Sequence, residues 1–501
     1  MTRKKVVIVG AGPGGLAAAM ILAHNKYDVH VYERKEHVGG RNFGFSLDGF
    51  TFDLGPTFFL MADVLDDIFS MTGRNLKDYV TLQRLDPLYR LVFPDGRNFY
   101  PTHDQDFMRR QMEEWIPGSY HGYRKYMTLE RKKYDRIIPC LRVPYLSPKD
   151  YFKARFFKSL PYLNATTSLF KYLGKYFSNP DMRVAFCFQA KYLGMSPWNC
   201  PGTFSILSFI EHGDGVYHVR GGLHQLSHAM DKAFREDGGQ LHLNTPIREI
   251  LIENGTAKGV LLENGETVLA DYVVINPDFA WAMNHLVADR HKRKYTPAKL
   301  AKKKYSCSTF MLYLGLNRIY DNLSHHNIFF AKNYKANVDD ISVHGRLSDD
   351  ISFYIQNASI TDDTLAPPGK SALYVLVPAA NNSFGISWTE KKGPFRDRVL
   401  DLMETRAGLT GLRDAIEVER VITPEDWEKE ENIYIGATFN LAHTIDQMLM
   451  FRPRNRFEEF RNCYLVGGGT HPGSGLPTIY ESGSISARLI MEQDGREIEW
   501  R

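Results

Sequence analysis

Runs of β-branched residues alternate with longer mixed runs at the start of the chain. Residues 6–9 read Val-Val-Ile-Val, an uninterrupted apolar run typical of a strand buried on both faces. A glycine-rich turn follows, then a helical pattern over 16–25 and a second strand-like run over 29–32. This order predicts a β-α-β unit.

Two later regions show the same alternation. A helix is predicted over 223–236, and a second helix over about 478–491 follows a strand and a glycine-rich turn. The strands predicted in these regions, some separated by Asn-Gly turns, cover 240–243, 249–253, 259–263, 272–276 and 463–466. We expect the three regions to assemble one discontinuous, doubly wound (Rossmann-like) α/β domain.

Two long segments separate these regions. Residues 102–210 are rich in aromatic and basic side chains and are predicted to be mostly helical. Residues 295–453 alternate strand-like runs, at 310–316, 328–330 and 372–377, with loops and a helix around 397–408. The chain contains no internal repeat and no low-complexity tract, so these segments are expected to be folded.

The composition narrows the class of protein. The chain has 501 residues, 43% hydrophobic and 24% charged, with a formal net charge of +4, which excludes a disordered, collagen-like or strongly charged polymer-binding protein. The length predicts two or three structural units. Five scattered cysteines without a Cys-x-x-Cys pair argue against a disulfide framework and a metal site, and they fit a reducing, cytoplasmic location.

Membrane insertion is not expected from the apolar pattern. No run of about 18 apolar residues occurs, and glycines break the N-terminal run where a signal peptide would continue. Any membrane contact is therefore expected to be peripheral.

The first glycine-rich turn matches the dinucleotide-binding motif Gly-x-Gly-x-x-Gly at Gly10, Gly12 and Gly15, with Gly14 inside it. It follows a strand and opens a helix, and Glu33 ends the second strand 18 positions after Gly15. In this context the glycines allow close approach of a pyrophosphate to the helix N-terminus, and the acid binds ribose hydroxyls. A merely tight turn would not require the acid at that spacing.

Three further motifs carry a resemblance to a known family. The segment from Glu33 to Gly39-Gly40-Arg41 resembles that of the flavin amine oxidase superfamily, which implies FAD rather than NAD. The element Asp53-Leu54-Gly55-Pro56-Thr57 narrows the resemblance to the carotenoid (phytoene or diapophytoene) desaturases and their oxygenase relatives. The stretch 464–478, which ends Gly-Leu-Pro-Thr, is similar to the closing signature of that family.

The resemblance implies a cofactor site and a domain plan. Beyond the first turn and Glu33, the expected FAD-binding residues are Gly40, Arg41, Gly55, Pro56, Thr57, Gly469, Leu476, Pro477 and Thr478. The FAD-binding domain is expected to comprise 1–100, 215–290 and 455–501. A helical, membrane-facing lobe (101–214) and a mixed α+β substrate domain (291–454) are expected between these segments.

A desaturase transfers a hydride to the flavin and releases a proton, so an acid or base in the site is conceivable but not obligatory. The sequence offers His471, Glu481, Asp53 and Asp150 as weak candidates. Each has a structural alternative: a turn residue for His471, a helix N-terminal acid for Glu481, and an exposed helix start after Ser147 for Lys149 and Asp150.

The segment 151–176 alternates aromatic residues with Lys and Arg. Such basic and aromatic stretches lie at the surface of anionic bilayers, where a carotenoid or its precursor would dissolve. A helix that packs within its own domain is the alternative. Nucleic acid is not an expected partner, because no RNA-binding motif accompanies the segment and the net charge is small.

The leading hypothesis is a carotenoid desaturase acting on phytoene or its shorter diapo analogue. A terminal oxygenase or ketolase of the same family is the alternative, because Gly467-Gly468-Gly469 departs from the Gly-Ala-Gly or Gly-Ala-Ser associated with desaturases. A flavin-free prenyl carrier, like the GDP-dissociation inhibitors, would have no reason to keep all the glycines with Glu33 and Arg41.

Overall fold

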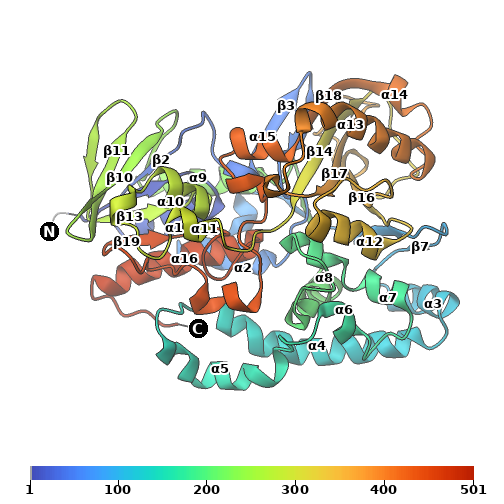
Figure 1. Ribbon diagram of the computed structural model, residues 1–501, viewed down its shortest axis with the longest axis horizontal. Helices are drawn as coiled ribbons and strands as arrows, with labels where there is room; N and C mark the ends of the chain where they lie inside the picture. Colours follow the sequence, from blue (N-terminus) through green and yellow to red (C-terminus); the bar gives the residue numbers. More distant parts are fainter. Residues whose placement is uncertain (1–2, 501) are drawn as a thin grey trace.

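The computed structural model describes residues 3–500 and contains two large sheets with a helical lobe below them (Figure 1). The first sheet is parallel, in the order β19-β13-β1-β2-β9. Its strands are β1 (Lys5–Val9), β2 (Asp28–Tyr32), β9 (Gln240–His242), β13 (Tyr272–Ile275) and β19 (Cys463–Leu465). Three distant segments of the chain therefore build one sheet, which confirms the predicted discontinuous α/β domain.

Successive side chains of β1 point to opposite faces of this sheet, and both faces are covered, so every residue of the apolar run 6–9 is buried. Val6 and Ile8 pack against one layer of helices, whereas Val7 and Val9 pack against α10 and a small antiparallel sheet. The helices of the first layer are α1 (Pro13–His24), α2 (Ala62–Met71), α9 (Gln225–Glu236) and α16 (Leu476–Gln493). The second layer contains α10 (Phe279–His285), β10 (Ile247–Glu253), β11 (Thr256–Leu262) and β12 (Thr267–Leu269).

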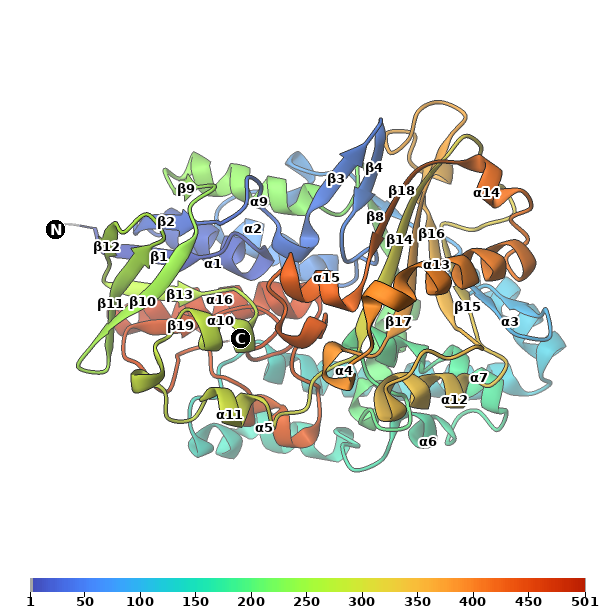
Figure 2. The same cartoon turned by 45° about the horizontal axis from the view of Figure 1, so that its top comes forward.

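The second sheet has the order β18-β14-β17-β16-β15-β6-β7 (Figure 2). Its strands are β6 (Arg90–Val92), β7 (Asn98–Phe99), β14 (Ser308–Leu316), β15 (His326–Phe329), β16 (Phe353–Asn357), β17 (Ser371–Ala379) and β18 (Ile416–Ile422). On β14, Phe310 and Leu312 face helix α13 (Trp388–Thr405), whereas Met311 and Tyr313 face the helical lobe. The lobe thus closes the inner face of this sheet.

The helical lobe lies along the lower edge of Figure 1. Its helices are α3 (Gln105–Trp115), α4 (Ser119–Leu141), α5 (Ala154–Ser159), α6 (Leu169–Leu173), α7 (Pro180–Ala185) and α8 (Ile206–Asp214). The remaining short elements are β3 (Gly44–Leu47), β4 (Phe50–Asp53), β5 (Leu82–Arg84), β8 (Tyr217–Val219), α11 (Pro297–Leu300), α12 (Tyr334–Asp339), α14 (Leu412–Ala415) and α15 (Pro424–Lys429).

Three details differ from the sequence predictions. Residues 1–100 were all expected to belong to the FAD-binding domain, but β6 pairs with β15 of the second sheet. The segment 151–176 is not one helix but the short helices α5 and α6 with 3-10 turns beside them, and Pro161 contributes because it provides no N–H for a further helical hydrogen bond. Helix α13 starts nine residues before 397 and runs through Pro394, since packing of Trp388 and Phe395 on Phe310 outweighs the helix-breaking tendency.

Candidate active site

The glycine turn after β1 is shaped by close backbone contacts. Gly10 has φ +87°, and a Cβ added to Gly15 would lie 2.4 Å from the carbonyl oxygen of Gly10. Gly12 is the N-cap of α1, and no side chain caps that helix. Gly10 and Gly12 line a cavity, whereas a Cβ on Gly14 would lie 3.0 Å from the backbone nitrogen of Gly467. Gly14 and Gly15 therefore act through packing, and the open helix N-terminus faces the cavity.

Glu33 is fixed beside this turn. Its two carboxylate oxygens accept the backbone N–H groups of Ala11 (2.8 Å) and Lys35 (3.0 Å), and its side chain lines the cavity. Each oxygen keeps a lone pair free for a further donor. This arrangement suits a carboxylate that accepts ribose hydroxyls.

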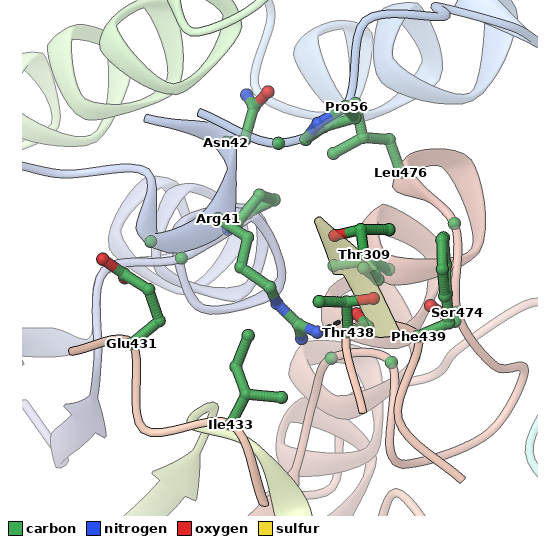
Figure 3. A pocket seen from close by; sticks show the side chains of 18 of the residues that line it. Arg41, Asn42, Pro56, Thr309, Glu431, Ile433, Thr438, Phe439, Ser474 and Leu476 are labelled. Atoms are coloured by element: carbon green, nitrogen blue, oxygen red, sulfur yellow. Dashed lines mark hydrogen bonds between the residues drawn. The ribbon is translucent and has the colours of Figure 1, made fainter. Parts of the chain in front are cut away.

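The next turn brings Arg41 across the cavity (Figure 3). Gly40 has φ +51° and lies against Gly12, so the two glycine turns approach each other closely. Arg41 donates to the carbonyl oxygen of Thr438 at 2.6 Å. Burial lowers the pKa of Arg41, and nearby Asp278 counteracts this effect. The guanidinium is thus a half-buried cation at the dinucleotide end of the cavity.

The predicted Gly55-Pro56-Thr57 segment lines the same cavity. The Tyr374 hydroxyl donates to the carbonyl oxygen of Gly55 at 2.6 Å, and the hydroxyl of Thr57 lies 2.9 Å from that of Tyr354. These bonds attach the segment to the second sheet.

Near the C-terminus, α16 begins at Leu476 after the N-cap Gly475, without a side-chain cap. Leu476, Pro477 and Thr478 line the cavity, so this is a second helix N-terminus that favours negative charge there. Gly469 does not line it: an added Cβ would lie 2.5 Å from that of Phe279, so this glycine serves packing.

The cavity has a volume of about 620 Å³ and continues from these turns into a chamber between the second sheet and the helical lobe. Figure 3 shows Arg41, with Leu476 and Ser474 on the side opposite Glu431. The chamber walls are mainly apolar or aromatic, and they include Phe58, Leu193, Leu207, Ile210, Met311, Ile328, Phe330, Leu376 and Trp427. One cavity therefore joins a dinucleotide cradle to an oily chamber.

The four residues that the sequence offered as an acid or base lie outside the cavity. Within residues 3–500, none of them lines its wall. His471 contacts the carbonyl oxygen of Val143 through Nε2 at 2.9 Å, and burial lowers its pKa to about 4. Asp150 accepts the N–H groups of Leu146 and Ser147 at 2.9 Å each, as a turn cap does.

The other two candidates are also structural. Asp53 accepts the N–H groups of Leu223 (2.8 Å) and His224 (2.9 Å) and so joins β4 to the turn before α9. Glu481 forms an ion pair with Arg142 at 3.1 Å and lies in the second turn of α16, beyond its N-terminus.

Sequence reasoning missed the polar side chains that the lobe contributes to the cavity. Lys191 and Tyr192 line it from a 3-10 turn (Phe188–Leu193). Burial lowers the pKa of Lys191. No motif in the sequence pointed to them, because a lysine and a tyrosine in a short turn have no characteristic spacing.

Comparison with known proteins agrees with this geometry. The family model described as flavin containing amine oxidoreductase matches residues 13–491. A 4,4'-diapophytoene desaturase (4,4'-diapolycopene-forming) from Methylomonas sp. is 50% identical over 98% of this chain and 96% of the relative. A zeta-carotene-forming phytoene desaturase from Myxococcus xanthus is 38% identical over 98% of this chain and 93% of the relative.

Solved structures share the fold at low sequence identity. An oxidoreductase from Methanosarcina mazei has a TM-score of 0.63 at 17% identity, covering 97% of this chain and 100% of that one. A putrescine oxidase bound to putrescine has a TM-score of 0.62 at 16% identity, covering 99% and 100%. The chain belongs to the flavin containing amine oxidoreductase family, within its carotenoid desaturases, and its cofactor is FAD.

Proposed function

We propose that this protein is an FAD-dependent desaturase that introduces double bonds into 4,4'-diapophytoene, a C30 polyene of the phytoene type. The carrying observation is the single cavity that joins the dinucleotide cradle to the apolar chamber. The preference for the C30 chain is supported by the diapophytoene desaturase that is 50% identical over 98% of this chain.

The chain's own residues would hold the cofactor at both of its ends. The N-terminus of α1 would take the pyrophosphate, Glu33 would accept the ribose hydroxyls, and Arg41 would bind phosphate oxygens. The uncapped start of α16, at Leu476 and Thr478, lines the cavity and would favour negative charge on the ring system of the cofactor. Bound FAD supplies two-electron oxidation, while the apolar walls orient the polyene and exclude water.

The test is mass spectrometry of products. The FAD-loaded protein is incubated with liposomes that carry C30 or C40 precursors, under isotopically labelled oxygen. We expect products that have lost pairs of hydrogens, carry no label and form faster from the C30 precursor. Label in the product, with activity only on conjugated carotenoids, would instead establish the oxygenase alternative.

We further propose that the protein takes its substrate from a membrane, which it contacts through the surface formed by residues 149–160 and 445–451. Five exposed large apolar side chains support this, on two segments joined where the N–H of Met450 donates to the Tyr151 hydroxyl at 3.2 Å. They are Phe152, Phe157, Leu160, Ile445 and Phe451, the first of them 75% exposed. Exposed Lys149, Lys153 and Lys158 accompany them and suit anionic headgroups.

No helix among residues 3–500 is long and apolar enough to cross a bilayer. Binding is therefore tested by co-sedimentation with vesicles of anionic lipid. Phe152→Ser with Phe157→Ser should lower the bound fraction at least about tenfold, because apolar burial supplies much of the affinity. The control Phe384→Ser, at an exposed phenylalanine after β17, should change nothing. Equal binding of both variants would refute this surface.

A further inference from the structure

Glu211 is a buried carboxylate without a cationic partner. It lies in α8 and is fully buried, and no Lys, Arg or His forms an ion pair with it in the described chain. One oxygen, Oε2, accepts hydrogen bonds from the Tyr89 hydroxyl (2.9 Å) and the Gln189 amide (2.8 Å). The other, Oε1, is buried and has no hydrogen-bond partner within residues 3–500. An unpaired buried acceptor of this kind is costly and calls for an explanation.

Tyr192 stands between this carboxylate and the cavity. Its side chain lines the cavity and packs against Phe58 at a ring distance of 5.2 Å. Its hydroxyl is buried and has no partner of good hydrogen-bond geometry among the described residues. Gln189, whose amide donates to Oε2 of Glu211, lies three residues before Tyr192 in the same 3-10 turn (Phe188–Leu193), where residues i and i+3 share one face. A free donor thus lies beside a free acceptor.

The surroundings keep Glu211 near the point of ionisation. Burial raises its pKa to about 7. The titratable side chains that interact with it are Tyr89, Tyr126 and Tyr192, whose pKa values are all raised, so they stay neutral. The neighbouring His212 also stays neutral, because burial lowers its pKa to about 3. A base with a pKa close to the working pH is well suited to proton transfer.

Other polar groups of the chamber are less suitable. The Tyr354 hydroxyl already has two partners, Thr57 (2.9 Å) and His326 (2.7 Å). Lys191 has no lone pair when it carries its proton. The Tyr192 hydroxyl, by contrast, has no hydrogen-bond partner among the described residues, and its turn carries the Gln189 amide that binds the Glu211 carboxylate.

We propose that the Tyr192 hydroxyl takes the proton that leaves the polyene during desaturation and passes its own proton to Oε1 of Glu211. The inference rests on the proposed function. Of the two C–H bonds that break, one leaves as a hydride with its electron pair, accepted by bound FAD. The electron pair of the other C–H bond becomes the new π bond, and its proton goes to the tyrosine oxygen. Tyr192 ends neutral and Glu211 protonated, and Glu211 releases that proton before the next cycle. Tyr192 is the catalytic residue, and Glu211 is the positioning residue behind it.

The test compares Glu211→Gln, Tyr192→Phe and the double variant in the FAD-loaded protein with liposomal substrate. Each single variant should lower kcat about 100-fold with KM within twofold, and the double variant should lose no more, because the two groups act in one relay. Tyr480→Phe and Glu481→Gln are the matched controls. The first removes a buried hydroxyl without a partner and the second a buried carboxyl, and both residues lie outside the cavity wall. Both should keep kcat within threefold.

The pH profile separates a proton acceptor from a structural residue. Since the base must be ionised, wild-type kcat should rise as pH increases through about 7. That rise should be absent in Glu211→Gln and present in Glu211→Asp, which keeps the carboxylate and should recover some of the rate. Independently of activity, difference infrared spectra in the Glu481→Gln background, which removes the other carboxyl with a pKa of about 7, should show a C=O band that disappears above pH 7 and is missing once Glu211→Gln is added.

Several outcomes would overturn the inference. One is a folded, flavin-containing Glu211→Gln that keeps the wild-type rate; if that variant fails to fold, an undiminished rate of Tyr192→Phe is as decisive. Such a result, with desaturated products from the wild type, refutes the relay alone. A wild type that forms no desaturated product refutes the proposed function and the relay together.

Discussion

Glu481 illustrates how burial and pairing oppose each other at a single carboxyl. Burial raises its pKa to about 7, although the ion pair with Arg142 acts to lower it. Arg142 also contacts Asp63 at 3.2 Å and Asp67 at 2.9 Å, so it stays paired without Glu481. This cluster joins the end of α4 to α2 and α16 and thereby attaches the lobe to the FAD-binding domain.

The pH dependence of stability should reveal Glu481. Its pKa is higher in the folded than in the unfolded protein, so the folded state binds more protons between pH 4.5 and 7 and stability falls as pH rises through that range. Glu481→Gln removes this loss and should raise the free energy of unfolding at pH 8 by up to about 3 kcal/mol. Urea unfolding at pH 5 and pH 8 measures the change in unfolding free energy. An equal change at the two pH values would contradict a raised pKa of Glu481.

Individual site residues were predictable where the chemistry fixes their spacing. Gly10, Gly12 and Glu33 follow from a turn that must approach a pyrophosphate, and the structure places all three in the cavity wall. Tyr192 and Glu211 belong to no local motif, because their meeting depends on how α8 packs against the turn before it. Spacing along the chain does not carry that information.

At the scale of elements, α1 and α16 lie unusually close because both carry small residues at the contact. A Cβ added to Gly483 would lie 2.5 Å from the carbonyl oxygen of Gly14 and 2.8 Å from the Cβ of Ala17. The two helices whose N-termini face the cavity are therefore held in register by a glycine at their crossing.

Gly483→Ala should separate α16 from α1. We expect a loss of about 1–3 kcal/mol in the free energy of unfolding, because a tightly packed contact cannot absorb a methyl group, and weaker retention of flavin during purification. The matched control is Gly393→Ala in α13, where an added Cβ meets nothing within 4 Å and should be neutral or stabilising. Chemical unfolding measures the stability of each variant, and flavin absorbance measures its flavin retention. Equal stability of Gly483→Ala and Gly393→Ala would show that the crossing of α1 and α16 is not tightly packed.

The strands and helices of the FAD-binding domain were predictable because their apolar patterns are local. The broken course of 151–176 and the partner of β6 were not. Pro161 interrupts the first, and the second depends on β15, which lies more than 230 residues away. Pairing over such a distance leaves no periodic trace in either strand.

For the whole molecule, the decisive feature is that the cavity lies between all the main units of the fold. The first sheet, the second sheet and the lobe each contribute to its wall. A ligand that fills it therefore stabilises the molecule as one unit.

FAD should raise the thermal midpoint of the apoprotein in a concentration-dependent way. At a free concentration 100 times Kd, the free energy of unfolding increases by about 2.7 kcal/mol, since the unfolded chain has no cavity. Riboflavin, which lacks the pyrophosphate and adenosine, should have little effect, because the glycine turn and Glu33 have nothing to bind. Differential scanning fluorimetry measures the thermal midpoint with each ligand. Equal stabilisation by FAD and riboflavin would count against the dinucleotide cradle.

The place of β19 in the first sheet has a consequence for biosynthesis. This strand pairs with β13, although 187 residues separate Ile275 from Cys463, and it is followed directly by the turn and helix that complete the cofactor site. During translation, β13 presents an unpaired edge and α1 lacks its cover until almost the entire chain has left the ribosome. The cofactor site is thus incomplete until the chain has been synthesised through α16, and the open edge of β13 is a place where the nascent chain could pair wrongly before then.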